Sequence, residues 1–167
     1  MGSWLEYLKN NDYIGIKKHL KDGADLQETN DIGESVLACA IRARCDIEIL
    51  MLLIESGADI FDFDEEGVSI LDIAITYDNL EIVNYLINQG ININTTNRRS
   101  GFTSLMAAAC YGRVEIMKVL LQEGADQKLK DTKGFTAIDF ARKMNKKSVL
   151  ALLDYDADEE QNRSVAK

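Results

Sequence analysis

The chain has 167 residues, 46 % of them apolar and 28 % charged, which is the composition of one ordinary folded domain. Its net charge of −9 argues against nucleic acid as the main partner, because phosphate binding needs clustered Lys and Arg. No apolar run approaches the ~20 residues of a membrane helix, and no signal peptide is evident. Cys39, Cys45 and Cys110 lack metal-ligand spacing and fit reduced thiols, so we expect a cytoplasmic protein that does not bind membranes.

Glycines recur with one period along the chain. One series lies at positions 33, 67, 101 and 134, and a second lies at positions 23, 57, 90 and 124. Both series advance by 33 or 34 residues, so one repeat contains two segments, each punctuated by a glycine. A period of this length is typical of proteins built from stacked structural repeats.

The first segment of each repeat predicts a short helix. A Ser or Thr follows the glycine by two positions and precedes an apolar run, which is the place of a helix N-cap. In two repeats an Asp follows the cap by three residues and completes a capping box, as in Ser69 with Asp72 and Thr136 with Asp139.

The second segment also predicts a helix. Residues 48–54, 81–87 and 115–121 carry apolar side chains at helical spacing. Each run ends at a glycine of the second series, which accepts the left-handed conformation that closes a helix. The polar segments between repeats predict extended loops, so each unit is a helix, a tight turn, a second helix and a loop.

These residues resemble the ankyrin repeat, whose pattern runs roughly D-x-x-G-x-T-P-L-H-x-A-A and later G-A-D. The first glycine series matches the pattern's first glycine, Leu37, Leu71, Leu105 and Ile138 match its Leu, and residues 57–59 and 124–126 read G-A-D. The resemblance implies an all-α ankyrin-repeat solenoid of helix-turn-helix units with extended loop or β-hairpin tips. It divides one domain, 1–154, into five units, and leaves 155–167 as a polar tail that we expect to be disordered. The units are 4–29 as N-terminal cap, 30–63, 64–96, 97–130, and 131–154 as C-terminal cap.

The chain departs from the family pattern in two ways. No unit keeps the Pro or His of the T-P-L-H motif. Because that His bridges backbone groups in the family, we expect these loops to be held by other contacts and the fold to be less stable than a consensus array. Single-residue insertions also appear within 41–47 and within 97–100, and insertions in repeat proteins map to exposed loops.

The resemblance also implies where a partner binds. Ankyrin proteins usually bind partner proteins on a concave face made of the loop tips and the exposed side of each first helix. Aromatic residues recur at these positions, and we expect Tyr77 to neighbour Tyr111 and Phe102 to neighbour Phe135, although packing between repeats is an alternative role for the phenylalanines. The predicted partner-binding residues are Phe63, Glu65, Glu66, Tyr77, Arg98, Arg99, Phe102, Tyr111, Lys133 and Phe135.

Charge is distributed unevenly along the chain. Residues 1–90 hold 6 Lys and Arg against 18 Asp and Glu, a balance of −12. Residues 91–153 hold 11 Lys and Arg against 5 Asp and Glu, a balance of +6. We expect this polarity to orient a partner of complementary charge and to speed its association.

The sequence gives little support for a catalytic site or a metal site. His19 is the only histidine, so any Ser–His–Asp or Cys–His arrangement would have to be built around it. Residues 62–67 begin like a calcium-binding EF-hand loop, but Ile73 stands where the twelfth-position Glu ligand belongs. We therefore predict no catalytic residue, no metal and no cofactor.

The sequence predicts a monomeric protein-interaction module that is not an enzyme. It would act as an adaptor or as a stoichiometric inhibitor of its partner. A regulatory subunit or chaperone-like holder of an enzyme remains an alternative, and a small hydrolase that uses His19 is a third. The sequence does not identify the partner.

Overall fold

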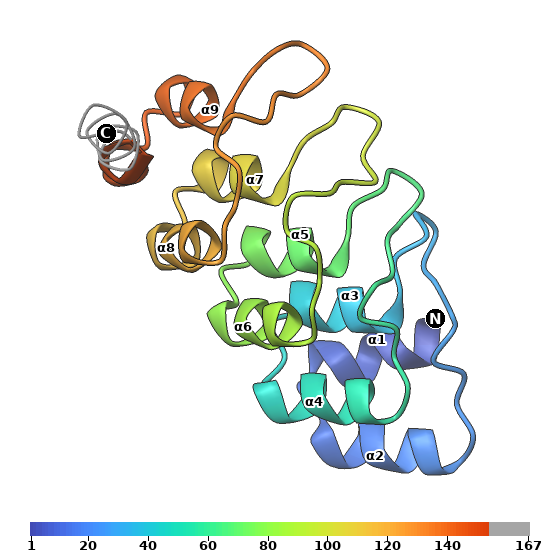
Figure 1. The fold of residues 1–167 in the computed structure, drawn as a ribbon. Coiled ribbons are helices and arrows are strands. Elements are labelled where there is room, and N and C mark those ends of the chain that lie inside the picture. The colour runs from blue at the N-terminus through green and yellow to red at the C-terminus, as the bar shows by residue number, and fades with distance from the viewer. Residues whose placement is uncertain (154–167) are drawn as a thin grey trace, which may run out of the picture. The chain divides into compact units, whose positions relative to one another are not determined.

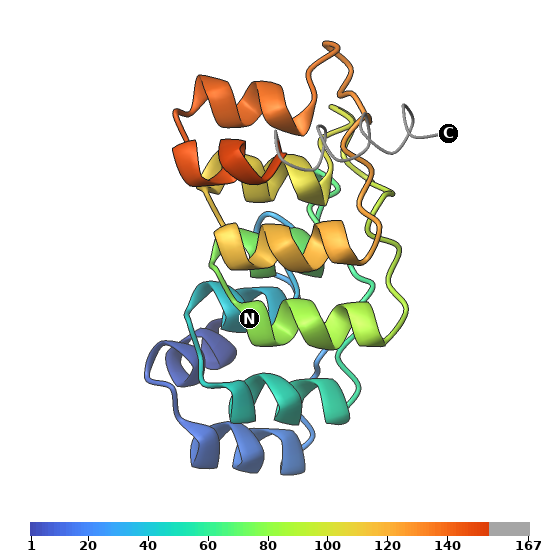
Figure 2. The same ribbon diagram turned by 60° about the vertical axis from the view of Figure 1, so that its left-hand side comes forward.

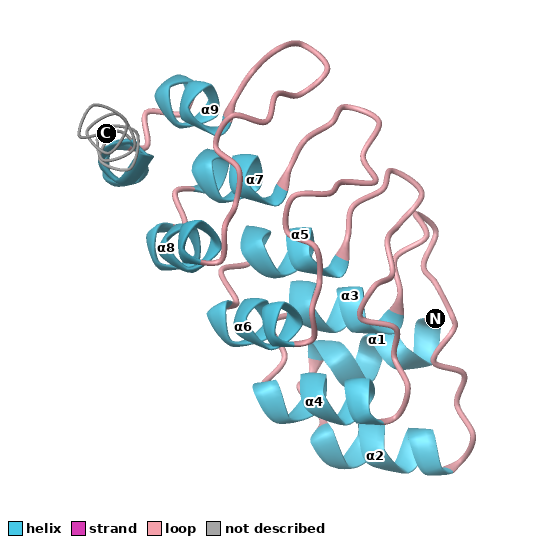
Figure 3. Ribbon diagram, viewed as in Figure 1, coloured by secondary structure: helices cyan, strands magenta, loops and turns pink. Residues whose placement is uncertain are grey.

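Helix pairs joined by tight turns build the protein, as a computed structural model of the chain shows (Figures 1 and 3). The structure describes residues 1–153, so the predicted polar tail 155–167 lies outside the described residues. A further helical segment begins at position 147 and continues to position 153. The helices before it are α1 (Gly2–Lys9), α2 (Tyr13–Lys21), α3 (Val36–Arg42), α4 (Ile47–Glu55), α5 (Ile70–Thr76), α6 (Leu80–Asn88), α7 (Ser104–Tyr111), α8 (Val114–Gln122) and α9 (Ala137–Lys143).

The chain divides into two compact units, Met1–Ile91 and Asn92–Lys167, which we call unit 1 and unit 2. In unit 1 the first helices α1, α3 and α5 contact one another in a row, and each also packs on the helix that follows it (Figures 1 and 2). Helix α2 contacts α4 in the second row. In unit 2, α7 packs on both α8 and α9. The predicted order of helix, turn, helix and loop is confirmed.

The first helices α3, α5, α7 and α9 begin where the sequence predicts, at Ser and Thr N-caps. The capping box of α5 is complete, because the Asp72 N–H donates to Ser69 Oγ at 3.1 Å and the Ser69 N–H donates to the Asp72 carboxylate at 3.3 Å. At α9 the backbone N–H and the hydroxyl of Thr136 both donate to the Asp139 carboxylate, at 2.8 and 2.9 Å. These local bonds satisfy backbone donors that a helix start leaves without partners.

The core lies between the helix rows. The first helices are buried on most sides: Ile41 and Ile75 have no exposed surface. The second helices bury one stripe, for example Leu50 and Leu53 of α4, and present their polar residues to solvent. Gly57 closes α4 with φ +108°, a left-handed conformation that side chains rarely adopt.

Each loop between repeats closes on a side chain at its base. In three loops a side-chain oxygen accepts the backbone N–H groups two and four residues further on, at 2.8 to 3.1 Å; these residues are Asn30, Asp64 and Asp131. In the loop with the insertion Thr96 replaces them: its hydroxyl accepts from the Arg98 N–H and donates to the Phe102 carbonyl. Isolated antiparallel bridges, Thr29 with Ser35 and Phe63 with Ser69, make the first two full loops hairpin-like. These bonds hold the loops that lack the motif's His.

Candidate partner-binding face

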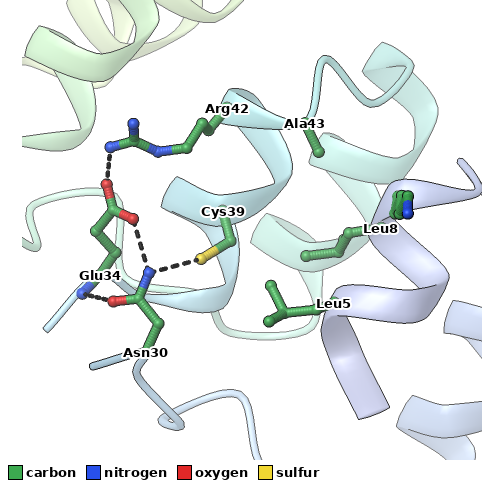
Figure 4. A pocket seen from close by; sticks show the side chains of 8 residues that line it. Leu5, Leu8, Asn30, Glu34, Cys39, Arg42 and Ala43 are labelled. Carbon is green, nitrogen blue, oxygen red and sulfur yellow. Dashed lines mark hydrogen bonds and ion pairs between the residues drawn. The ribbon is translucent and has the colours of Figure 1, made fainter. Parts of the chain in front are cut away.

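In each unit the loop tips and the exposed side of the first helices make up the candidate binding surface, which we call the hairpin face. In unit 1 its centre is an ion pair between Glu34 and Arg42 (Figure 4). Glu34 follows the turn glycine and is 2 % exposed, whereas Arg42 ends α3 and is about half exposed. Asn30 donates to the other Glu34 carboxylate oxygen at 2.8 Å. A buried carboxylate is therefore held by two donors from two elements, which compensates for its desolvation.

Tyr77 continues this cluster at the end of α5. Its hydroxyl accepts a hydrogen bond from Arg42 at 3.0 Å, and its carbonyl accepts one from Arg44 at 3.3 Å. Both guanidinium groups lie over its ring, at 5.5 and 5.6 Å from the centroid. Tyr77, which was predicted to present its ring to a partner, is half-buried, and the arginines beside it are part of the surface that a partner would meet.

A pocket of about 370 Å³ opens beside the ion pair (Figure 4). Its apolar walls come from Leu5 and Leu8 of α1 and from Cys39 and Ala43 of the α3 region. Its polar lining consists of Asn30, Glu34, Arg42 and Lys9. Burial, and then the negative charge of Glu34, raises the pKa of the Cys39 thiol to about 11. The thiol therefore stays neutral and lines the pocket as an apolar group, not as a nucleophile.

The next hairpin of unit 1 carries exposed apolar and acidic side chains. Phe61 and Phe63 are 56 % and 50 % exposed, and Glu65 and Glu66 are exposed at the tip. This tip lies against the preceding one, because a Cβ added to Gly33 would stand 2.9 Å from Glu65 Cγ and 3.3 Å from its backbone nitrogen. The two neighbouring hairpins of unit 1 therefore lie side by side, as their ribbons show (Figure 1).

In unit 2 the residue that directly follows each turn glycine is aromatic. Phe102 and Phe135 both contact Phe140 of α9 edge-on, with ring centroids 5.2 and 6.0 Å apart. The Arg98 guanidinium lies over the Phe102 ring, 4.9 Å from its centroid. Phe102 is half-buried and Phe135 is 44 % exposed. The two rings therefore pack inside the unit and still offer exposed surface to a partner.

The remaining predicted residues of unit 2 are exposed cations and one phenol. Arg99 and Lys133 are exposed at two loop tips, and Tyr111 is 47 % exposed at the end of α7. The Arg113 guanidinium lies 5.8 Å from the Tyr111 centroid. The predicted contact of Tyr77 with Tyr111 joins a residue of unit 1 to a residue of unit 2, and it stays a prediction.

The residues of the hydrolase alternative form a small cluster in the N-terminal cap. His19 Nε2 lies 3.2 Å from Ser3 Oγ, and the imidazole packs against Trp4 and Tyr7, with ring centroids 4.7 and 5.2 Å apart. No hydrogen bond between a carboxylate and His19 is found in the described part of the chain. The contacts that are seen are those of a histidine packed on the aromatic residues of a cap.

The loop that resembles the start of a calcium site is a hairpin. Asp64 accepts backbone N–H groups and closes the turn, as above, and residues 1–153 contain no cluster of three potential metal ligands. The same range contains no helix that is long and apolar enough to cross a membrane.

Two features of the hairpin face were missed by sequence reasoning. The Glu34–Arg42 pair was not predicted, although among the full repeats only the first carries opposite charges at these two places. Phe140 was also missed, because it lies inside the short helix α9 and not at a loop tip. The contacts that make both important depend on packing and not on spacing in the sequence.

The protein consists of repeated helix pairs, hairpins closed by side-chain hydrogen bonds, and exposed aromatic and charged side chains beside the first helices. These features define a helical repeat protein that binds other molecules. Residues 6–97 and 94–163 match the family described as ankyrin repeats in three copies. The chain therefore belongs to the ankyrin-repeat family, as its sequence predicts, and it is an all-α ankyrin solenoid.

Several curated proteins are similar to this chain. The putative ankyrin repeat protein FPV031 of fowlpox virus is 31 % identical over 149 residues, which cover 84 % of this chain and 43 % of that protein. The B-cell lymphoma 3 protein homolog of Mus musculus is 34 % identical over 119 residues, covering 71 % and 26 %. The E3 ubiquitin-protein ligase hecd-1 of Caenorhabditis elegans is 40 % identical over 104 residues, covering 62 % and 4 %. The chain thus spans less than half the length of each of these relatives.

Proposed function

We propose that this chain binds a partner protein through its hairpin face and acts as an adaptor or as a stoichiometric inhibitor. Ankyrin repeats are general protein–protein interaction modules, and the chain belongs to that family. The observation that carries the proposal is the set of large side chains that the fold leaves exposed on this face: Phe63, Tyr111 and Phe135 are 44 % to 50 % exposed. Exposed aromatic residues next to arginines are the common composition of binding hot spots.

Several finer points belong to the same proposal. The chain works as a monomer in the cytoplasm, does not act as an enzyme and does not bind nucleic acid. The buried thiols of Cys39 and Cys45, whose pKa values burial raises to about 11, support a reducing setting, because such thiols serve the core as small apolar groups. The excess of negative charge supports the exclusion of nucleic acid.

The test begins with capture of a partner from a lysate of the source organism and its identification by mass spectrometry. The dissociation constant of the purified pair is then measured by calorimetry for the Tyr77→Ala/Tyr111→Ala variant. We expect affinity to fall at least about tenfold, because tyrosines flanked by arginines are typical hot spots.

The matched control is Tyr85→Ala, which removes a half-buried tyrosine from the second helix α6. It should change the affinity by less than about twofold, since residues outside an interface contribute little. Circular dichroism checks that all variants are folded. Unchanged affinity in the double variant, with its fold intact, would show that the partner binds elsewhere.

A further inference from the structure

The hairpin between α4 and α5 carries two exposed phenylalanines. Phe61 and Phe63 are 56 % and 50 % exposed, whereas Asp62 and Asp64, which alternate with them, are half-buried. The Phe61 N–H donates to the Asp59 carboxylate at 2.9 Å in the turn that opens the loop, and Phe63 pairs with Ser69 in an antiparallel bridge. The backbone beside both rings is thus held by local bonds, and both side chains are accessible to a partner.

The repeat framework does not require apolar residues at these two places. They stand four and six residues after the glycine that ends the preceding helix, and the corresponding residues of the other repeats are polar. These equivalents, all exposed or half-buried, are Gln27 and Thr29, Asn94 and Thr96, and Lys128 and Lys130. Since the same backbone accepts polar side chains, the two phenylalanines are not explained by the fold. Clustered exposed apolar residues of this kind mark interaction sites.

The surroundings of the two rings are acidic. Asp31, Glu65 and Glu66 are exposed at the two adjoining tips, and none of them forms an ion pair with a described residue. The sequence contains no Lys or Arg between Arg44 and Arg98, so the second hairpin carries carboxylates and no cation of its own. Ile32, 55 % exposed, adds a third apolar side chain at the first tip.

We propose that these two hairpins form a docking surface, the acidic hairpin patch, for a basic segment of a partner protein that carries a large apolar side chain. The patch consists of Asp31, Ile32, Phe61, Phe63, Glu65 and Glu66. The apolar side chain of the partner packs on the two phenylalanine rings, and its flanking Lys or Arg residues meet the tip carboxylates. Acidic tips repel phosphate-rich surfaces, which disfavours nucleic acid and anionic lipid as occupants. The inference rests on the proposed function and specifies the chemistry of its partner.

The test uses a fluorescein-labelled synthetic peptide in which Lys and Arg flank a central Trp, with fluorescence anisotropy as the measurement. Two further peptides replace the basic residues by Glu or the Trp by Ser. The protein variants are Glu65→Gln/Glu66→Gln, which keeps side-chain shape, and Phe61→Asn/Phe63→Thr, which installs the residues found at Asn94 and Thr96. The matched control, Glu48→Gln/Glu55→Gln, removes the same charge from the exposed side of α4.

We expect each patch variant to weaken binding of the basic Trp peptide about tenfold, because surface charges and aromatic anchors contribute on the order of 1 kcal/mol or more to an interface. The control should change binding less than about twofold, and both altered peptides should bind more weakly to the unmodified protein. Raised ionic strength should weaken binding through the carboxylates but leave the effect of the phenylalanines.

Four outcomes would overturn the proposal. Equal losses in the control and patch variants would show attraction to net charge alone. Preference for the acidic peptide would show the wrong partner chemistry. Self-association of the protein in sedimentation runs that the Glu65→Gln/Glu66→Gln variant abolishes would make a second copy the occupant. If the captured partner loses affinity with Tyr77→Ala/Tyr111→Ala but not with the patch variants, the proposed function stands and this inference fails.

Discussion

Units 1 and 2 use one framework of repeats and fill the same positions with different chemistry. The residue after the turn glycine and the residue that ends the first helix are Glu34 and Arg42 in the first full repeat of unit 1, and they form an ion pair whose carboxylate is buried. In unit 2 the first of these positions holds Phe102 and Phe135, which pack on Phe140. The caps, turns and core are shared, so the framework leaves these positions free to differ in charge and polarity. The repeats are therefore distinguished by their hairpin face and not by their core.

The largest effect is expected at the ion pair of unit 1. Glu34→Ala should lower the free energy of unfolding by about 2 kcal/mol, less than for a fully buried pair because Arg42 is half exposed. Arg42→Ala should cost a similar amount, since it leaves the Glu34 carboxylate buried with Asn30 as its donor. Urea unfolding of the single and double variants measures both costs.

The double variant decides whether the pair acts as one. Its loss of unfolding free energy should be smaller than the sum of the two single losses by about 1 kcal/mol or more, because each single variant leaves the other residue without its ion-pair partner. Glu66→Ala, at an exposed tip, serves as the control and should change stability by less than about 0.5 kcal/mol. Additive losses would mean that the contrast between the units does not depend on this ion pair.

The parts of the structure that could be predicted from the sequence are the local ones. The glycine series predicted the repeat, and Ser69 with Asp72 and Thr136 with Asp139 predicted two capping boxes, because each involves residues three apart. A third box was missed at Thr103, where the N–H donates to the sulfur of Met106, an unusual acceptor, at 3.4 Å.

The candidate site was predictable only as a set of positions. Loop tips and helix ends follow from the repeat pattern, but the pattern does not say which side chains cover one another. Tyr77 was expected to be accessible, and Arg42 and Arg44 lie over its ring. Phe102 and Phe135 were expected to be neighbours, and the ring on which both of them pack, Phe140, was not foreseen. Contacts between segments far apart in sequence depend on packing, which single-sequence patterns do not contain.

A smaller effect is expected at the capping box of unit 2, and it depends on pH. Hydrogen bonds from the backbone and then the hydroxyl of Thr136 lower the pKa of Asp139. A carboxyl with a lowered folded-state pKa stabilises the fold above its unfolded pKa of about 3.9 and loses this contribution as pH falls through the folded value. Asp139→Asn should therefore cost about 1 kcal/mol at neutral pH and nothing in strong acid.

Unfolding of wild type and Asp139→Asn, measured from neutral to acid pH, checks this prediction. Asp72→Asn makes the corresponding change in the box of unit 1 and shows whether shared local bonds contribute alike in both units. A penalty for Asp139→Asn that stays constant into strong acid would mean that the carboxylate charge has no part in the cap.

Binding through the hairpin face is tested most directly by hydrogen exchange of the protein with and without its captured partner, read residue by residue. If the hairpin face binds, protection should increase in the hairpins around Ile32, Phe63 and Phe135 and at the ends of α3 and α5, while the exposed side of α4 and α6 exchanges as before. Protection confined to α2, α4, α6 and α8 would contradict binding at the hairpin face, because it would place the partner on the second helices.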